Sequence, residues 1–128
     1  MFEYHGWLTI QSSAGDEEDE DLLAAHNVVD RVVRESGLGT LRMVNGMSQF
    51  HISGFVNHRA GEGQEVVDLF QYVGKLAPGS YGLLYIRDDE DAGGRVNEFQ
   101  ALVMKRGTVS QHPDPFLSPC IPEIEDDE

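Results

Sequence analysis

The sequence predicts an α+β fold, with one antiparallel β-sheet and two helices packed on one of its faces. Two observations predict this class: several segments alternate apolar and polar residues, and two longer segments repeat apolar residues at helical spacing. The length of 128 residues fits one domain. We therefore expect a single domain over residues 1–122, followed by an acidic C-terminal tail over residues 123–128.

The first half of the chain predicts a strand, a helix and a hairpin. From Phe2 to Gln11, alternate residues are mostly apolar, which is typical of a strand with one buried face. From about Glu18 to Ser36, apolar residues recur at helical spacing with charged residues between them. Asn45-Gly46 supplies the positive φ that a two-residue turn needs, so we expect a hairpin of residues 41–44 and 47–56.

The second half of the chain predicts one helix and two further strands. Helical spacing of apolar residues over residues 66–76 predicts a helix that Pro78-Gly79 ends. Tyr81 to Arg87 is apolar on both faces, as in a central strand, and Val96 to Arg106 is the expected returning strand. After Gly107 the chain is rich in proline and carries no expected element. The whole order contains β-α-β-β-α-β, the ferredoxin-like arrangement, with one extra C-terminal strand.

The strong negative charge limits the partners that the protein can have. The formal net charge is −14, from 9 Lys and Arg against 23 Asp and Glu. This charge repels phosphate groups, so we expect neither nucleic-acid binding nor attachment to an anionic membrane. A basic protein is the complementary partner. The N-terminal residues show no signal-peptide pattern, and the single cysteine cannot form an internal disulfide, so we expect a cytoplasmic protein.

The sequence matches no catalytic, cofactor or metal template, so we predict a non-enzymatic protein without a cofactor or a metal. The histidines are scattered, and neither a phosphate-binding loop nor a nucleophile motif occurs. The acidic run Asp88–Asp91 could begin a calcium loop, but Phe99 or Gln100 stands where that loop needs a bidentate glutamate. Cys120 lies in the proline-rich segment without a nearby histidine, and we expect it to be a small hydrophobe or an exposed thiol.

Most of the acidic residues fall in three short clusters, at residues 16–21, 88–91 and 123–128. Clustered like charges repel one another and lower stability, so such clusters usually have either a structural role or a functional one. The structural reason is solubility, and for the first cluster also the positive end of the helix that follows it. The functional reason is a cationic partner, which the clusters would attract and whose association they would accelerate.

Strand parity predicts a further surface on the face of the sheet that the helices leave open. Six residues of the first and third strands point to this face: His5, Trp7, Thr9, His51, Ser53 and Phe55. Exposed rings on an open sheet also stack RNA bases, but the negative charge opposes RNA. Two alternatives remain for Trp7: the C-terminal segment Phe116–Pro119 covers it, or it contacts a partner protein.

Several motifs occur in a specific order along the chain: Met1–Trp7, Asn45–Met47, Phe50–Gly54, Pro78–Tyr85, Arg87-Asp88 and Val103–Gly107. Together they resemble the immunity protein 7 family of bacterial polymorphic toxin systems, over residues 1–121. The resemblance implies a small antidote that is encoded beside a toxin, binds the toxin domain and protects the producing cell. It implies no catalytic residue.

On the basis of this resemblance, we expect a monomer that binds its toxin one to one and occludes it. An acidic antidote suits a basic toxin, such as a nuclease or an ADP-ribosyltransferase. The expected toxin contacts are acidic and aromatic residues: Asp88, Asp89, Glu90, Asp91, Trp7, His51, Phe55, Asp19 and Glu20. Two alternatives stay open, namely an enzyme that reverses the toxin's damage and an acidic interaction module that self-associates.

Overall fold

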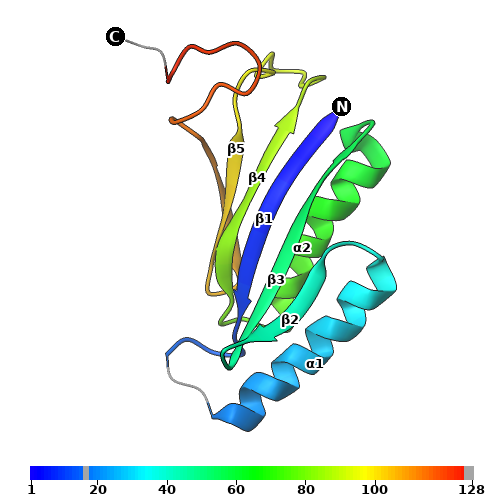
Figure 1. Ribbon diagram of the computed structural model, residues 1–128, viewed down its shortest axis with the longest axis vertical. Coiled ribbons are helices and arrows are strands. Elements are labelled where there is room, and N and C mark those ends of the chain that lie inside the picture. The colour runs from blue at the N-terminus through cyan, green and yellow to red at the C-terminus, as the bar shows by residue number, and fades with distance from the viewer. Residues whose placement is uncertain (16–17, 126–128) are drawn as a thin grey trace.

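The computed structural model describes residues 1–15 and 18–125, which form one six-stranded antiparallel sheet and two α-helices (Figure 1). The strands are β1 (Phe2–Ile10), β2 (Thr40–Val44), β3 (Met47–Val56), β4 (Tyr81–Asp88), β5 (Gln100–Lys105) and β6 (Thr108–Pro113). The helices are α1 (Asp19–Ser36) and α2 (Gln64–Leu76), and a short turn, η1 (Arg59–Gly63), whose backbone is not helical at Ala60 and Gly61, precedes α2. The predicted α+β class, antiparallel sheet and two helices are confirmed. Residues 16–17 of the first acidic cluster and residues 126–128 of the expected tail lie outside the described residues.

The strand order in the sheet is β2-β3-β1-β4-β5-β6, which makes β1 an inner strand. β1 pairs antiparallel with β3 on one side and with β4 on the other, so that Trp7 lies opposite both His51 and Leu83. Because β2 is antiparallel to β3, it runs parallel to β1, and α1 makes the crossover between these two strands. In the same way α2 connects β3 to β4, with β1 between them.

Both helices pack on the same face of the sheet, and the hydrophobic core lies between the helices and the strands (Figure 1). Fully buried residues include Phe2 and Leu8 of β1, Val29 of α1 and Phe70 of α2, and they belong to one cluster. The even-numbered residues of β1 point to this core because side chains alternate along a strand. Among the described helices, none combines the length and the apolar character needed to cross a bilayer.

The prediction for the C-terminal strands is wrong: it has one returning strand over residues 96–106 and none after it. The structure has a shorter β5 and a further strand, β6. Residues 96–99 are not in a strand, and Arg106-Gly107 forms a tight turn, with φ of 49° and 78°, that leads into β6. β6 lies at the edge of the sheet, and all its side chains except that of Val109 are exposed. It therefore has almost no apolar alternation to detect, and an edge strand tolerates the terminal Pro113.

The two-residue turns at Gly46 and Gly107 give a matched test of this edge. Both glycines have positive φ, but only at Gly107 would a Cβ meet backbone, 2.6 Å from the Gly74 oxygen and 3.0 Å from the Pro78 Cα. We expect Gly46→Ala to lower the free energy of unfolding by about 1–2 kcal/mol, the cost of the left-handed conformation alone. Gly107→Ala should cost about 1–3 kcal/mol more, because the backbone around it must shift.

Urea unfolding of both variants measures these costs. Equal losses for the two variants would contradict the close approach of the β5–β6 turn to the end of α2.

Candidate functional site

The face of the sheet opposite the helices carries a row of polar and aromatic side chains, which we call the open face. Its members come from three strands: Glu3, His5, Trp7 and Thr9 of β1, Gln49, His51, Ser53 and Phe55 of β3, and Tyr81, Leu83, Tyr85 and Arg87 of β4. The parity expected from the sequence for β1 and β3 is confirmed by the register of the two strands. Trp7 is 38% exposed, Phe55 60% and Tyr81 43%, so three large rings of this face meet solvent.

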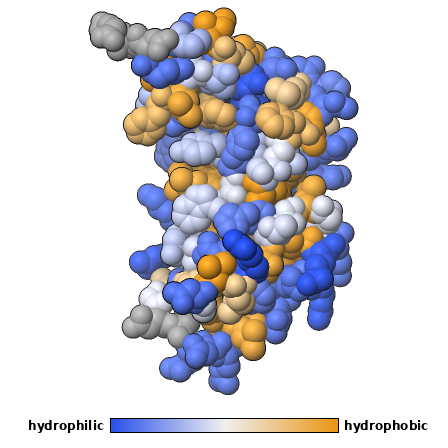
Figure 2. Space-filling model, in the orientation of Figure 1, coloured by the Kyte–Doolittle hydropathy of each residue, from blue (hydrophilic) through white to orange (hydrophobic). Residues whose placement is uncertain are grey.

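The rings of the open face hold one another edge to face. Trp7 and Tyr81 have centroids 6.2 Å apart, and His5 lies 6.1 Å from Phe55 and 6.2 Å from Phe99. T-shaped packing is a preferred geometry of aromatic pairs, so each of these rings has a neighbour that favours its orientation. In the view of Figure 2, hydrophobic side chains form separate patches among hydrophilic ones. A partner protein would therefore meet a mixed surface that includes paired aromatic rings.

Two adjoining hollows share His5 and Tyr85 on the open face. The first, of about 380 Å³, is also lined by Trp7, His51 and Ser53. The second is lined by residues that come partly from the C-terminal segment, Phe116 and Leu117 among them. This segment thus lies against the His5 side of the face, and Trp7 remains 38% exposed. The alternative in which the segment covers Trp7 is therefore wrong, and contact with a partner protein stays a prediction.

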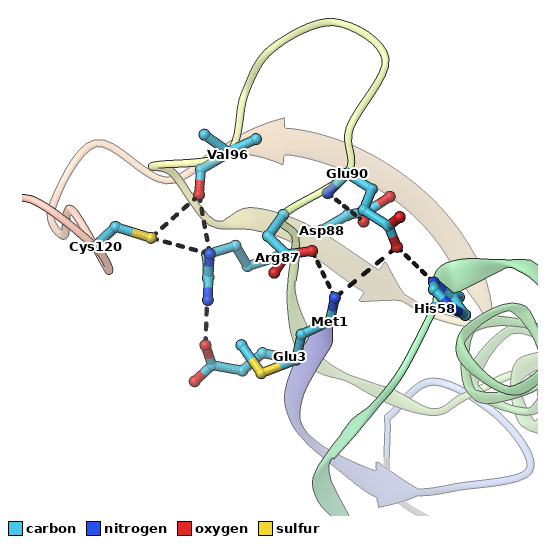
Figure 3. A network of polar contacts seen from close by, with 9 residues as sticks. Met1, Glu3, His58, Arg87, Asp88, Glu90, Val96 and Cys120 are labelled. Carbon is cyan, nitrogen blue, oxygen red and sulfur yellow. Dashed lines mark hydrogen bonds and ion pairs between the residues drawn. The ribbon is translucent and has the colours of Figure 1, made fainter.

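At the end of β4, Asp88–Asp91 forms what we call the acidic loop, which is tied to β1 and to the segment before η1 (Figure 3). The Met1 ammonium donates a hydrogen bond of 2.5 Å to Asp89 and lies 3.9 Å from Glu90. His58 Nδ1 lies 2.6 Å from Glu90 Oε1, and the Glu90 N–H donates to Asp88 Oδ1 at 2.9 Å. Carboxylate oxygens of Asp88, Asp89 and Glu90 lie within 4.8 Å of one another, so these three residues are the candidate cation ligands.

Two carboxylates of the acidic loop are held in the ionised form. The hydrogen bond from the Met1 ammonium keeps the pKa of Asp89 below its ordinary value. The pKa of Asp91 is also lowered, chiefly by the backbone N–H of Arg95 and further by the Arg95 charge and the N–H of Gly93. Both stay ionised far below neutral pH, so the acidic loop offers a permanent negative charge beside the open face.

Arg87 is the buried cation of this end of the sheet, with 8% of its surface exposed. Its Nε lies 3.4 Å from Glu3 Oε1, and its Nη1 donates to the Val96 carbonyl at 3.1 Å and to Cys120 Sγ at 3.0 Å (Figure 3). One guanidinium therefore joins β1 and β4 to the C-terminal segment. Cys120 is exposed, so of the two predictions for this residue the exposed thiol is confirmed. The sequence did not predict its contact with Arg87.

The comparisons with known proteins agree with this architecture. The family model described as Immunity protein 7 matches residues 1–126, nearly the whole chain. The chain belongs to this family. It is an immunity protein directed against a polymorphic toxin, and its partner is a protein toxin. The comparison with curated proteins and the comparison with solved structures give no match.

The structure brings together only part of the toxin contacts expected for this immunity protein. Trp7 and His51 are cross-strand neighbours. Phe55 lies near the acidic loop, because it pairs with Glu3 and the preceding residue, Phe2, pairs with Asp88. Asp19 and Glu20 lie elsewhere, in the first turn of α1, at the opposite end of the sheet (Figure 1). The two acidic clusters therefore do not form one patch.

Sequence reasoning missed several residues of the open face. Tyr81 and Tyr85 of β4 point the same way as Trp7, and Phe99 stacks edge-on against Tyr85 at 6.0 Å. The parity of β4 could have located the two tyrosines, once that strand was placed beside β1. Nothing local marks Phe99, because it lies outside any strand and reaches the face only through the loop before β5.

The Arg87 contacts predict a stability effect at Glu3. Glu3→Gln removes the carboxylate that faces the buried guanidinium, and we expect a loss of about 1.5–3 kcal/mol in the free energy of unfolding, as for hydrogen bonds to charged groups. The matched control Glu35→Gln, on the exposed surface of α1 and away from its first turn, should stay within about 0.5 kcal/mol of the unchanged protein. Equal effects in urea unfolding would show that Glu3 does not stabilise Arg87.

The acidic loop predicts a measurable titration of Asp91. Its pKa should lie below the ordinary 3.8, and Arg95→Ala should raise it only in part, because the backbone N–H at that position is retained. A lowered folded-state pKa means that Asp91 contributes stability above its ordinary pKa and loses it as the pH falls through the lowered one. Carbon-detected NMR titration measures both values, with Arg34→Ala on α1 as the control that leaves Asp91 unchanged. Titration at or above 3.8 would contradict the geometry of the loop.

Proposed function

We propose that this immunity protein neutralises its toxin by stoichiometric binding, one to one, through the open face and the acidic loop. The observation that carries the proposal is that the open face extends to the acidic loop, whose carboxylates at Asp89 and Asp91 stay ionised. Exposed Phe55, packed edge-on against His5, lies at the loop end of this face, and Trp7 and His51 lie farther along the same two strands. Aromatic side chains supply most of the binding energy in many protein interfaces, whereas charges at the rim mainly raise the association rate. Trp7, His51 and Phe55 are the proposed anchors, and Asp88–Asp91 is the proposed charged rim.

The toxin surface that fits this face is basic. A net charge of −14 attracts a cationic domain over several ångströms and repels an acidic one. A nuclease has a cationic groove for its nucleic acid, and an immunity protein that covers the groove would block substrate entry. An ADP-ribosyltransferase, which must bind an anionic dinucleotide, is the second toxin class that suits an acidic antidote.

Asp19 and Glu20 belong to the proposal as a second contact. A partner that touches both these residues and the acidic loop must follow β1 along its length, about 30 Å at ~3.3 Å per residue. An interface of standard size, about 800 Å² on each protein, is of similar width. These carboxylates also stabilise the first turn of α1 through the helix dipole, so their loss would lower stability as well as binding.

Co-expression with the toxic domain encoded directly upstream tests the proposal. Restored growth together with a one-to-one complex in multi-angle light scattering supports neutralisation by occlusion. Restored growth without a complex would overturn occlusion and favour an enzyme that reverses the damage. Self-association of the free chain at micromolar concentration, without growth rescue, would favour the acidic interaction module instead.

Charge reversal tests the role of the acidic loop. We expect the double variant Asp89→Lys/Glu90→Lys to slow association with the toxin about tenfold at low salt, and to flatten the dependence of the rate on salt. The control Glu35→Lys/Glu65→Lys makes the same change of net charge on exposed residues of the two helices. Stopped-flow or surface plasmon resonance gives both rates. If the two double variants associate equally fast, the acidic loop has no local role.

A further inference from the structure

The second hollow of the open face, which we call the Asp114 hollow, has the size and lining of a pocket for one side chain. It encloses about 230 Å³ and is lined by His5, Tyr85, Phe99, Asp114, Phe116 and Leu117. Sites for small molecules usually measure about 300–1,000 Å³, so this hollow is smaller than most of them. Its lining is almost wholly apolar apart from one carboxylate, and it opens on the same face as Trp7.

The walls of the Asp114 hollow are aromatic on two sides. Tyr85 and Phe99 meet at 6.0 Å with their planes at 61°, and His5 meets Phe99 at 6.2 Å with 70° between the planes. These contacts favour the observed orientations of the three rings. The outer wall is the C-terminal segment, in which Phe116 is 70% exposed although it borders an apolar space. A cation that lay over the face of one of these rings would be attracted to it.

Asp114 is the unusual member of the lining. It is only 6% exposed, yet its carboxylate accepts one hydrogen bond, from the Leu117 N–H to Oδ2 at 3.1 Å, within the part of the chain that the structure describes. The backbone N–H of Asp114 donates to the Phe99 carbonyl at 2.9 Å, which holds the residue in this position. A buried carboxylate is costly unless charged or polar donors satisfy both of its oxygens. Among the described residues none donates a hydrogen bond to Oδ1, and a bound cation would supply the missing donor.

We propose that the Asp114 hollow receives one long basic side chain, an arginine or a lysine, from the bound toxin. The head of this side chain pairs with the Asp114 carboxylate, and its apolar stem packs against Tyr85, Phe99 and Phe116. The inference rests on the proposed function, because it names the toxin chemistry that the open face anchors. It assigns the anchoring to a residue outside the three acidic clusters, and it predicts an effect on the dissociation rate, whereas the acidic loop acts on association.

Two variants test the Asp114 hollow against the toxic domain encoded directly upstream. Phe116→Ala removes an exposed ring, and Asp114→Asn removes the charge but retains an oxygen that can accept from Leu117. We expect each variant to weaken the complex about tenfold or more, mainly through faster dissociation. The matched controls are Tyr72→Ala, an exposed ring on α2, and Glu35→Gln, an exposed carboxylate on α1, which should stay within about twofold of the unchanged protein.

Replacing each arginine and lysine of the toxin in turn identifies the partner residue. One of these replacements should show a coupling with Asp114→Asn, so that the double variant loses little more than either single one. If the complex forms but both hollow variants bind like the unchanged protein, the hollow is not used and the proposed function stands. If both weaken binding and no basic toxin residue couples, the proposed cation is wrong. Failure of the unchanged chain to bind the toxin would remove the proposed function and this inference together.

Discussion

The structure depends first on the pairing of β1 along both of its edges. All nine residues of this strand pair with β3, and eight of them also pair with β4, so one register sets the position of three strands. Its even-numbered side chains enter the core beneath the helices, and its odd-numbered side chains form the middle of the open face. A shift of one residue would exchange these two sets, which would expose Phe2 and Leu8 and bury Glu3 and His5. The core and the proposed binding surface are therefore determined by the same hydrogen bonds.

The second constraint is the buried guanidinium of Arg87. An unpaired buried charge is costly, so this guanidinium needs partners. Its partners are the Glu3 carboxylate of β1, the Val96 carbonyl and the Cys120 sulfur. Val96, in the loop between β4 and β5, and Cys120, in the C-terminal segment, therefore both lie against this guanidinium. Asn97 strengthens the same junction, since its side-chain oxygen accepts from the N–H groups of Cys120 and Ile121 at 2.8 and 2.9 Å. The C-terminal segment is thereby positioned as one wall of the Asp114 hollow.

The two carboxylate sites have different proposed electrostatic roles. Exposed carboxylates in the acidic loop act at a distance and are screened by salt, so their proposed role is to raise the rate at which the toxin arrives in a productive orientation. A buried carboxylate in an apolar hollow acts only at contact, where the low polarity of the surroundings strengthens its pairing with a cation. An immunity protein has to capture its toxin quickly and release it rarely. The described surface offers one feature suited to each requirement.

The sequence by itself determined the features that are periodic or local. Alternation identified the two faces of β1 and β3, helical spacing identified both helices, and Asn45-Gly46 located a turn in which both residues have positive φ. The family motifs added the kind of partner. These features depend on neighbours within a few residues, so a single sequence contains them.

Only the tertiary structure decided the features that join distant residues. β6 has too few apolar residues to show a period, and the Asp114 hollow combines His5 with Phe99 and Asp114, which come from separate parts of the chain. The acidic loop lies beside the start of β1, whereas α1 begins after the end of β1, so the two acidic clusters lie at opposite ends of the sheet. Nothing in their sequences distinguishes these positions. Such contacts depend on strand order and on single long-range hydrogen bonds, and no local pattern records them.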